Sequence, residues 1–446
     1  MSDFLRIMSA TTVRPSPSSG GDRRIELTPS DLKYLSIDQI QKGLLFRKPA
    51  QPISDLDLAQ HLKASLSKTL AIFYPLGGRL AMVDHGENDT VSFSVDCNGE
   101  GALFVHAVTN GVSVSDVLDP NNHVPDDVVY SFFPMNGVLN HEGVSKPLVA
   151  VQLTELDDGF FIACSMNHSV ADGTSFWHFL NTWSGISSSQ NDVVSRLAPP
   201  FLGREYLNGV VDLPVRFPFC PPRARSFTPP PLKQRIFHYS KPKIAELKAK
   251  ANAEMGFTAQ HKISSLQSLM AHLWVSITRN RNFNGNEQVS YGVFIGLRTR
   301  MVPPLPEEYL GNAVQLGVAK STAGELLERG LGWAALKINE SIYSVTAGVE
   351  VKKLLKDWVE NPSLMKIEGI PRNMLTTGSS PRFDVYGNDF GLGKPVGVRS
   401  GPGNKFDGKL TVFSGAEDGS IDFEACLSPQ TLENLAHDLG FMETLG

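Results

Sequence analysis

The chain has 446 residues, more than one hydrophobic core normally supports, so we expect two domains. Hydrophobic residues make up 41% and charged residues 20%, the composition of an ordinary globular protein. The net charge of −5 offers no general attraction to nucleic acid or to an anionic membrane, and no apolar run approaches the roughly 18 residues of a spanning helix. We therefore expect neither nucleic acid nor a membrane as a partner.

The start of the chain and its cysteines favour a cytoplasmic protein. The first residues lack the apolar core of a signal peptide. Segment 9–24 is rich in Ser, Thr, Gly and Arg, which is typical of a transit peptide or, as we favour, of a flexible terminus. The four cysteines lie far apart without metal-ligand spacing, so we expect reduced thiols and no metal. Cys164 is expected to be a small buried side chain rather than a nucleophile.

Periodicity predicts a mixed α/β chain. The first clear element is a helix in 55–80, where Leu58, Leu62, Leu66 and Leu70 recur every four residues until Pro75. Between residues 199 and 231 lie nine of the 29 prolines, which predicts an extended crossover between two halves. The other expected elements, in chain order, are strands 91–97, 102–108, 147–155 and 159–167, helices 241–254 and 264–278, strand 288–296, helices 322–345 and 347–359, strands 408–414 and 420–426, and a helix from Pro429.

His168 is the strongest candidate for chemistry. It lies four residues before Asp172, between a buried strand and a helix with an apolar face at Phe176, Phe179 and Trp183. The two other His-x-x-x-Asp spacings, at 85–89 and 123–127, lie in turns or loops. A strand-to-helix junction projects a side chain outward, as a general base requires. The alternative is a hydrogen-bonded histidine at the end of a strand.

The neighbours of His168 are expected to support it. Asp172 could carry catalytic charge, but we favour a role in holding the loop, by capping the helix or by pairing with an arginine. Gly173 is expected to allow a tight backbone turn or the close approach of a ligand. The chain contains no Gly-x-Ser-x-Gly elbow, His-Glu-x-x-His or Walker motif. The glycines of 391–397 predict a structural loop rather than a dinucleotide site.

The motif His168-x-x-x-Asp172-Gly173, followed some 220 residues later by Asp389-Phe-Gly-Leu-Gly393, resembles the plant BAHD acyl-CoA-dependent acyltransferases. The resemblance covers nearly the whole chain. Further similar stretches are Val13–Ser16, Glu26–Asp31, Gln41–Phe46, Leu66–Leu80, Gln267–Trp274 and Pro303–Asn312.

The resemblance implies an α/β fold of two chloramphenicol-acetyltransferase-like domains, joined by a long crossover, with an active-site tunnel between them. We place the N-terminal domain at 1–192 plus 389–415, the crossover at 193–235, and the C-terminal domain at 236–388 plus 416–446. We expect a monomer.

The resemblance also implies a reaction. Acyl-CoA would be a co-substrate, with no permanently bound cofactor, and His168 would deprotonate a hydroxyl or amine of a plant specialised metabolite. The acyl group, whether acetyl or aromatic such as benzoyl or hydroxycinnamoyl, is left open. Asp172 would pair with Arg298 or, alternatively, Arg300, while Asp389, Gly391 and Gly393 would form a structural loop.

The sequence departs from the family pattern at two positions. Leu392 replaces the tryptophan of the family's Asp-Phe-Gly-Trp-Gly motif. Ser380 stands where the family carries a tryptophan near the acyl pocket, so Ser380, Thr377 or Thr376 would stabilise the oxyanion. Ser264 and Ser265 are the candidates for contacting CoA, or they form a helix cap. Two other functions stay open: a CoA-independent lyase or cyclase using the same tunnel, and a non-catalytic ligand-binding protein.

Overall fold

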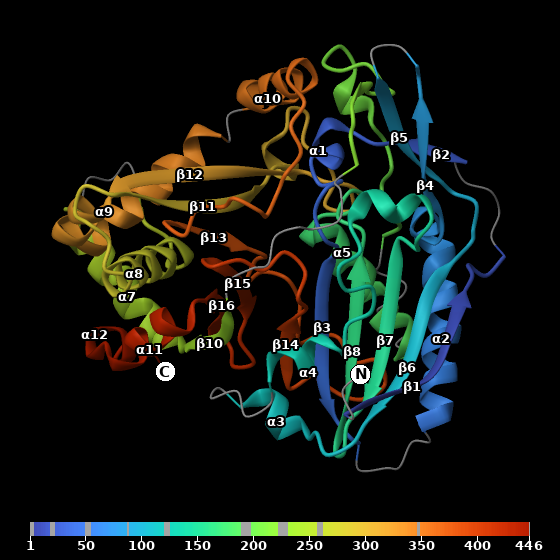
Figure 1. Cartoon of the computed structure of the whole chain (residues 1–446), viewed down its shortest axis with the longest axis horizontal. Helices are drawn as coiled ribbons and strands as arrows, with labels where there is room; N and C mark the ends of the chain where they lie inside the picture. Colours follow the sequence, from blue (N-terminus) through green and yellow to red (C-terminus); the bar gives the residue numbers. More distant parts are fainter. Residues whose placement is uncertain are drawn as a thin grey trace.

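The computed structural model describes residues 4–17, 23–49, 55–86, 89–119, 125–188, 198–221, 231–256, 262–345 and 348–445. Two six-stranded sheets lie side by side, each with helices on its outer side (Figure 1). In these residues no helix is both long enough and apolar enough to span a bilayer.

The first sheet has the strand order β1-β6-β7-β8-β3-β14. Its strands are β1 (Leu5–Val13), β3 (Ile40–Arg47), β6 (Ala102–Thr109), β7 (Val149–Glu155), β8 (Gly159–Met166) and β14 (Gly397–Ser400). Strands β7 and β8, both predicted, form an antiparallel hairpin. All residues of β8 are buried, which explains its continuous apolar sequence. The strand therefore delivers the chain to residue 168 from inside the core.

Helices α2 (Asp55–Ile72) and α5 (Gly173–Ser187) pack together on the first sheet (Figure 1). The periodic leucines Leu62, Leu66 and Leu70 of α2 are fully buried, as predicted. A smaller sheet contains β2 (Arg24–Glu26), β4 (Arg79–Asp84), β5 (Thr90–Asp96) and β9 (Phe217–Pro218).

The second sheet has the order β10-β16-β15-β13-β11-β12. Its strands are β10 (Lys233–Tyr239), β11 (Gln288–Gly296), β12 (Val314–Thr322), β13 (Met374–Gly378), β15 (Lys409–Ser414) and β16 (Ile421–Leu427). The helices of this half are α7 (Lys241–Glu254), α8 (Ser265–Asn280), α9 (Ala323–Ser344), α11 (Pro429–His437) and α12 (Leu439–Met442). The helix α10 (Gly348–Glu360) contacts α1 (Pro29–Leu32), so it reaches across to the first half.

Short elements complete the chain. They are η1 (Tyr74–Gly77), α3 (Val114–Leu118), α4 (Asp126–Tyr130), η2 (Asn140–Val144), η3 (Glu205–Leu207) and η4 (Arg298–Arg300). Parts of the expected crossover, 193–197 and 222–230, lie outside the described residues, as do residues 189–192 and His123. The described part between them pairs with both halves, because β9 pairs with β5 and Phe201 bridges to Tyr309.

Two expectations are wrong. Segment 9–24 is not simply a flexible terminus, because residues 5–13 form β1, which pairs with β6 along its whole length. Segment 389–415 does not belong entirely to the first half. It contributes β14 to the first sheet, but β15 at 409–414 is hydrogen-bonded into the second sheet between β13 and β16. The chain therefore crosses back between residues 400 and 409.

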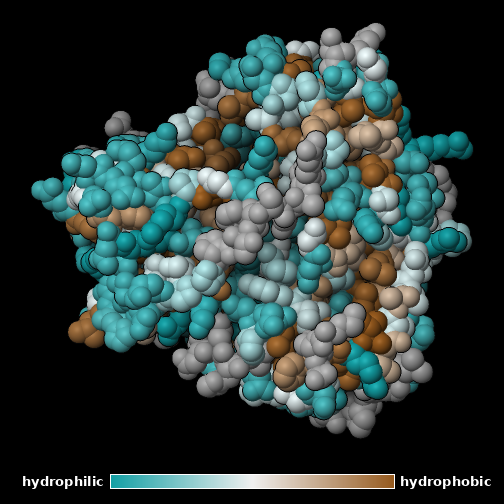
Figure 2. Space-filling model, in the orientation of Figure 1, coloured by the Kyte–Doolittle hydropathy of each residue, from teal (hydrophilic) through white to brown (hydrophobic). Residues whose placement is uncertain are grey.

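The surface is mixed in character. Figure 2 shows mostly hydrophilic side chains over the second half and more hydrophobic ones on the side where the first sheet lies. Strand β1, at the edge of that sheet, exposes Ile7 and Met8.

Candidate active site

The loop 167–172 joins β8 to α5 and carries His168. Asn167 holds the loop from inside: its side-chain Oδ1 accepts from the amide of Ser169 at 2.9 Å, and its Nδ2 donates to the backbone oxygen of Asn140 at 2.7 Å. Every residue of this loop is buried except His168, which is half-buried. The imidazole is thus the one side chain that the loop leaves accessible.

The His168 ring stacks on an aromatic neighbour. It lies parallel to the ring of Tyr34, with centroids 4.3 Å apart. Its Nδ1 atom is buried and has no hydrogen-bond partner among the described residues. Burial lowers the pKa of His168 to about 4, and the charge of Lys409 adds to this, while the charge of Asp172 opposes it. The imidazole is therefore neutral at pH 7.

Two asparagines hold the backbone of His168. Its amide donates to Oδ1 of Asn140 at 2.8 Å, and its carbonyl accepts from Nδ2 of Asn312 at 2.8 Å. Asn312 comes from the second half and is itself held by the buried carboxylate of Asp31, which accepts from both its amide and its Nδ2. Both halves therefore determine the position of His168.

Sequence reasoning did not assign these supporting residues. Asn312 and Asp31 lie at the ends of stretches that resemble the family, which is the one feature of the sequence that could have pointed to them. Asn140 and Tyr34 carried none.

Asp172 caps α5 and pairs with Arg298. Its carboxylate accepts from both terminal nitrogens of Arg298, at 2.6 and 2.9 Å, and from the amides of Ser175 and Ala313, each at 3.0 Å. Burial alone would raise the pKa of Asp172, but the charge and hydrogen bonds of Arg298 hold it below its ordinary value. Arg300, the alternative partner, is exposed and donates instead to the carbonyl of Gly296.

Gly173 does not make the tight turn that was one of its two expected roles. It is the first residue of α5, and its φ is not in the left-handed region. A Cβ at this position would lie 3.1 Å from the ring of Phe383. The expected tight turn is therefore absent, and the missing side chain leaves room for a ring that packs against the core of the first half. The expected close approach of a ligand stays a prediction.

The hydroxyls around Ser380 differ in what they already bind. Thr377 is buried and hydrogen-bonded to the hydroxyl of Tyr291 at 2.6 Å, and Thr376 is also buried. Ser380 is half-buried and its oxygen accepts from the amide of Arg382, so its O–H remains able to donate.

The loop at Asp389 packs against α5. The Asp389 carboxylate accepts from the amides of Gly391 and Gly393, and both glycines have positive φ, 87° and 85°. The amides of Asp389 and Phe390 donate to the hydroxyl of Ser184 in α5. The bonds of this loop are thus local or directed to the helix that follows His168. Leu392, which stands at the family's tryptophan position, is buried.

Ser264 and Ser265 lie at the start of α8. Ser264 is the N-cap, where its hydroxyl accepts from the amide of Gln267 and its own amide donates to the Gln267 side chain. Ser264 is exposed and Ser265 half-buried. Across the described ranges, no group of three His, Cys, Asp or Glu side chains is arranged to hold a metal ion.

Comparison with known proteins identifies the family. The model of the family described as "Transferase family" matches residues 4–442. An uncharacterized acetyltransferase of Arabidopsis thaliana is 42% identical over 98% of this chain and 99% of its own length. The BAHD acyltransferase DCR of the same organism is 32% identical over 98% of this chain and 92% of its own length.

Solved structures share the fold. Vinorine synthase covers 99% of this chain and 98% of its own, with a TM-score of 0.74 and 21% identity. TRI101 of F. sporotrichioides, solved with coenzyme A and T-2, covers 95% of this chain and 99% of its own, with a TM-score of 0.72 and 16% identity. These likenesses confirm the predicted α/β fold class, and together with the sequence matches they show that the chain belongs to the transferase family of the BAHD acyltransferases.

Proposed function

We propose that this protein transfers an acyl group from acyl-CoA to a hydroxyl or amine of a small-molecule acceptor, with His168 as the general base. The observation that carries this is a neutral, half-buried imidazole at a strand-to-helix junction, with its backbone pinned from both halves. The structure of TRI101 with coenzyme A and T-2 supports CoA and a small acceptor as the two substrates. We infer that they meet in a tunnel between the two halves.

His168 would act twice in the reaction. Its neutral imidazole takes the proton from the acceptor as the acceptor attacks the thioester carbonyl, and the imidazolium then protonates the departing CoA thiolate. We assign both transfers to Nε2, because Nδ1 is buried. Acid–base help of this kind contributes about 10²- to 10⁴-fold, and holding two substrates together contributes more.

The remaining roles follow from the contacts around His168. Asp172 and Arg298 position the loop and do not touch the substrates. Ser380 is the proposed oxyanion donor, because its O–H is free to donate, whereas Thr377 is already engaged. Ser264 and Ser265 are the proposed contacts for CoA, because their side chains are exposed and half-buried, respectively, at the positive end of the α8 dipole.

A panel of acyl-CoAs, crossed with alcohols and amines, tests the function by following thiol release and product mass. We expect product that contains the acyl group and an equal amount of free CoA for at least one pair. Turnover of a single acylated compound without CoA would overturn acyl transfer in favour of a lyase. Absence of turnover, with ligands bound, would favour a binding protein.

A further inference from the structure

The two sheets meet along a seam that contains three lysines and one glutamate. Ser400 of β14 donates its amide to Glu424 of β16 at 2.9 Å, which joins the first sheet to the second. Lys405 forms an ion pair with the same carboxylate and donates to the hydroxyl of Ser400. Lys42 of β3 and Lys409 of β15 complete what we call the seam cluster: Lys42, Lys405, Lys409 and Glu424.

The seam cluster has more positive than negative charge. Lys405 neutralises Glu424, but the ammonium groups of Lys42 and Lys409 make no hydrogen bond or ion pair with any described residue. For Lys409, the neighbouring groups with an electrostatic effect are Lys405 and the thiol of Cys426, and neither is an anion at pH 7. The buried guanidinium of Arg298, by contrast, is paired with the carboxylate of Asp172.

Aromatic rings face the two unpaired ammonium groups. The Nζ atom of Lys42 lies 5.2 Å from the ring centre of Phe413, and that of Lys409 lies 5.4 Å from the ring centre of Phe294. Burial lowers the pKa of Lys42 to about 7 and that of Lys409 to about 8. Both side chains are nonetheless half-buried rather than fully enclosed. At pH 7 Lys409 is therefore mostly charged and Lys42 about half charged. Each has a ring on one side and N–H groups that remain free to donate.

Lys409 lies beside the candidate active site. Its Nζ would be 2.8 Å from a Cβ at Gly378, so the absence of a side chain there makes room for the ammonium. Gly378 ends β13 and leads directly to Ser380, the proposed oxyanion donor. The positive charge of Lys409 also helps to lower the pKa of His168. Lys42 pairs in register with Cys164 of β8, the strand that leads to His168.

We propose that Lys409, backed by Lys42, is an anion-binding subsite that holds a carboxylate carried by one of the two substrates. This rests on the proposed acyl transfer, because it is that reaction which brings two substrates to His168. The carboxylate belongs either to the acyl group, as in a dicarboxylic acyl-CoA, or to the acceptor. In both cases it would supply the counter-charge that the seam cluster lacks.

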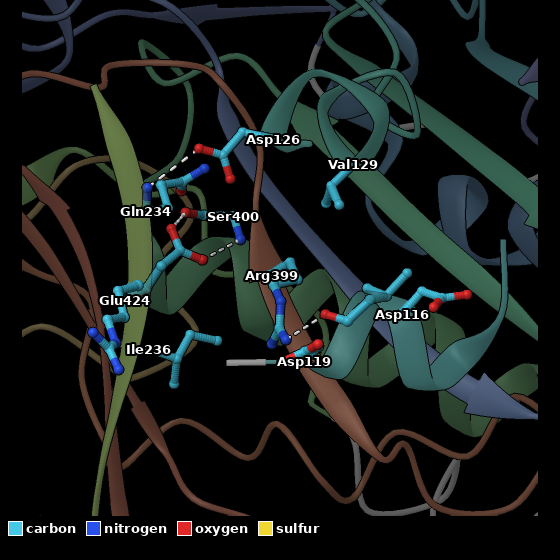
Figure 3. A pocket seen from close by; sticks show the side chains of 11 residues that line it. Asp116, Asp119, Asp126, Val129, Gln234, Ile236, Arg399, Ser400 and Glu424 are labelled. Carbon is cyan, nitrogen blue, oxygen red and sulfur yellow. Dashed lines mark hydrogen bonds between the residues drawn. The ribbon is translucent and has the colours of Figure 1, made fainter. Parts of the chain in front are cut away.

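A nearby pocket does not serve this purpose. It lies between α3, α4 and β14 on one side and β10 and β16 on the other (Figure 3). Its lining carries four carboxylates, from Asp116, Asp119, Asp126 and Glu424, against the two guanidinium groups of Arg235 and Arg399. An anion is therefore disfavoured there, and Lys409 is the better site for a carboxylate.

Isothermal titration calorimetry on the purified protein tests the proposal, because it measures ligand affinity without turnover. One arm compares hydroxylated aromatic and aliphatic carboxylates with their methyl esters. The other arm compares malonyl-CoA with acetyl-CoA, so that the CoA phosphates cancel. We expect the carboxylate to bind more tightly in one arm by about 10- to 150-fold, the value of a hydrogen bond to a charged group.

Lys409→Met should abolish that preference, whereas Lys241→Met, which removes an exposed lysine paired with Asp418, should keep it. Removing an unpaired buried charge should not lower the melting temperature, and Lys409→Gln provides a second variant if the first fails to fold. The proposal is overturned if neither arm shows tighter binding of the carboxylate, or if the Lys409 variants keep this preference. It is also overturned if the Lys409 variants weaken the binding of acid and ester equally. Failure of the thiol-release assay alone would refute acyl transfer and not this binding preference.

Discussion

The pairing of Asp172 with Arg298 predicts that Asp172→Asn acts mainly on stability. The carboxylate receives four hydrogen bonds: Oδ1 accepts from Ser175 and Arg298, and Oδ2 accepts from Arg298 and Ala313. An amide can accept at only one of these positions, and its NH₂ group would face donors at the other. The variant therefore loses about half of the bonds and leaves the Arg298 guanidinium, which is only 5% exposed, without its counter-charge.

The magnitude follows from this burial. Breaking a buried ion pair by removing one partner typically costs about 3–5 kcal/mol, because the remaining charge is not compensated. This is a large part of the roughly 5–15 kcal/mol that stabilises a typical domain. Removing both charges in Asp172→Asn/Arg298→Met should recover much of the loss. The matched control Arg329→Ala, in a half-exposed pair with Glu325, should cost less than about 1 kcal/mol.

Urea denaturation followed by tryptophan fluorescence measures these differences, since Trp177 and Trp183 lie on the helix that Asp172 caps. Thiol release per folded molecule is measured in parallel. We expect the Asn variant to lose stability strongly while its folded fraction retains more activity than His168→Ala. A variant that unfolds like the wild type but has no activity would refute the positioning role and assign Asp172 to the chemistry.

Three further predictions concern pH, positioning and the second motif. The acid limb of the pH profile of kcat/KM should have its midpoint near pH 4 rather than 6.5. Burial lowers the pKa of His168, and activity falls only when the neutral base becomes protonated. A midpoint near 6.5 would contradict this. Asn312→Ala removes the hydrogen bond to the His168 carbonyl and should lower kcat by about 10-fold with KM little changed. A change confined to KM would instead assign Asn312 to substrate binding. Gly391 has a φ of 87°, which an alanine adopts only with strain, so Gly391→Ala should lower the free energy of unfolding by about 1 kcal/mol and leave the KM for acyl-CoA unchanged. An altered KM would place this loop at the CoA site.

The elements predicted well are those with a local pattern. The four-residue period of Leu62, Leu66 and Leu70 and the hairpin before His168 need no information from distant residues. Strands β14 and β15 could not be assigned to their sheets in this way. They are short, only a few residues apart, and their pairing partners lie far away in the sequence.

The same distinction applies to the site. His168 and Asp172 were found from a short motif in a strand-to-helix context. The residues that hold the motif come from elsewhere: Asn312 and Asp31 are 281 positions apart, and Arg298 is 126 positions from Asp172. No sequence periodicity connects such residues. The reason for Gly173 also depended on a distant neighbour, Phe383.

The most direct test of the central claim is the single-turnover rate of thiol release at pH 7 for the wild type and His168→Ala, measured with an acyl-CoA and acceptor pair that the wild type uses. The base assigned to His168 predicts a fall of about 10²- to 10⁴-fold, with acyl-CoA binding retained. A variant rate close to that of the wild type would contradict general-base catalysis by His168.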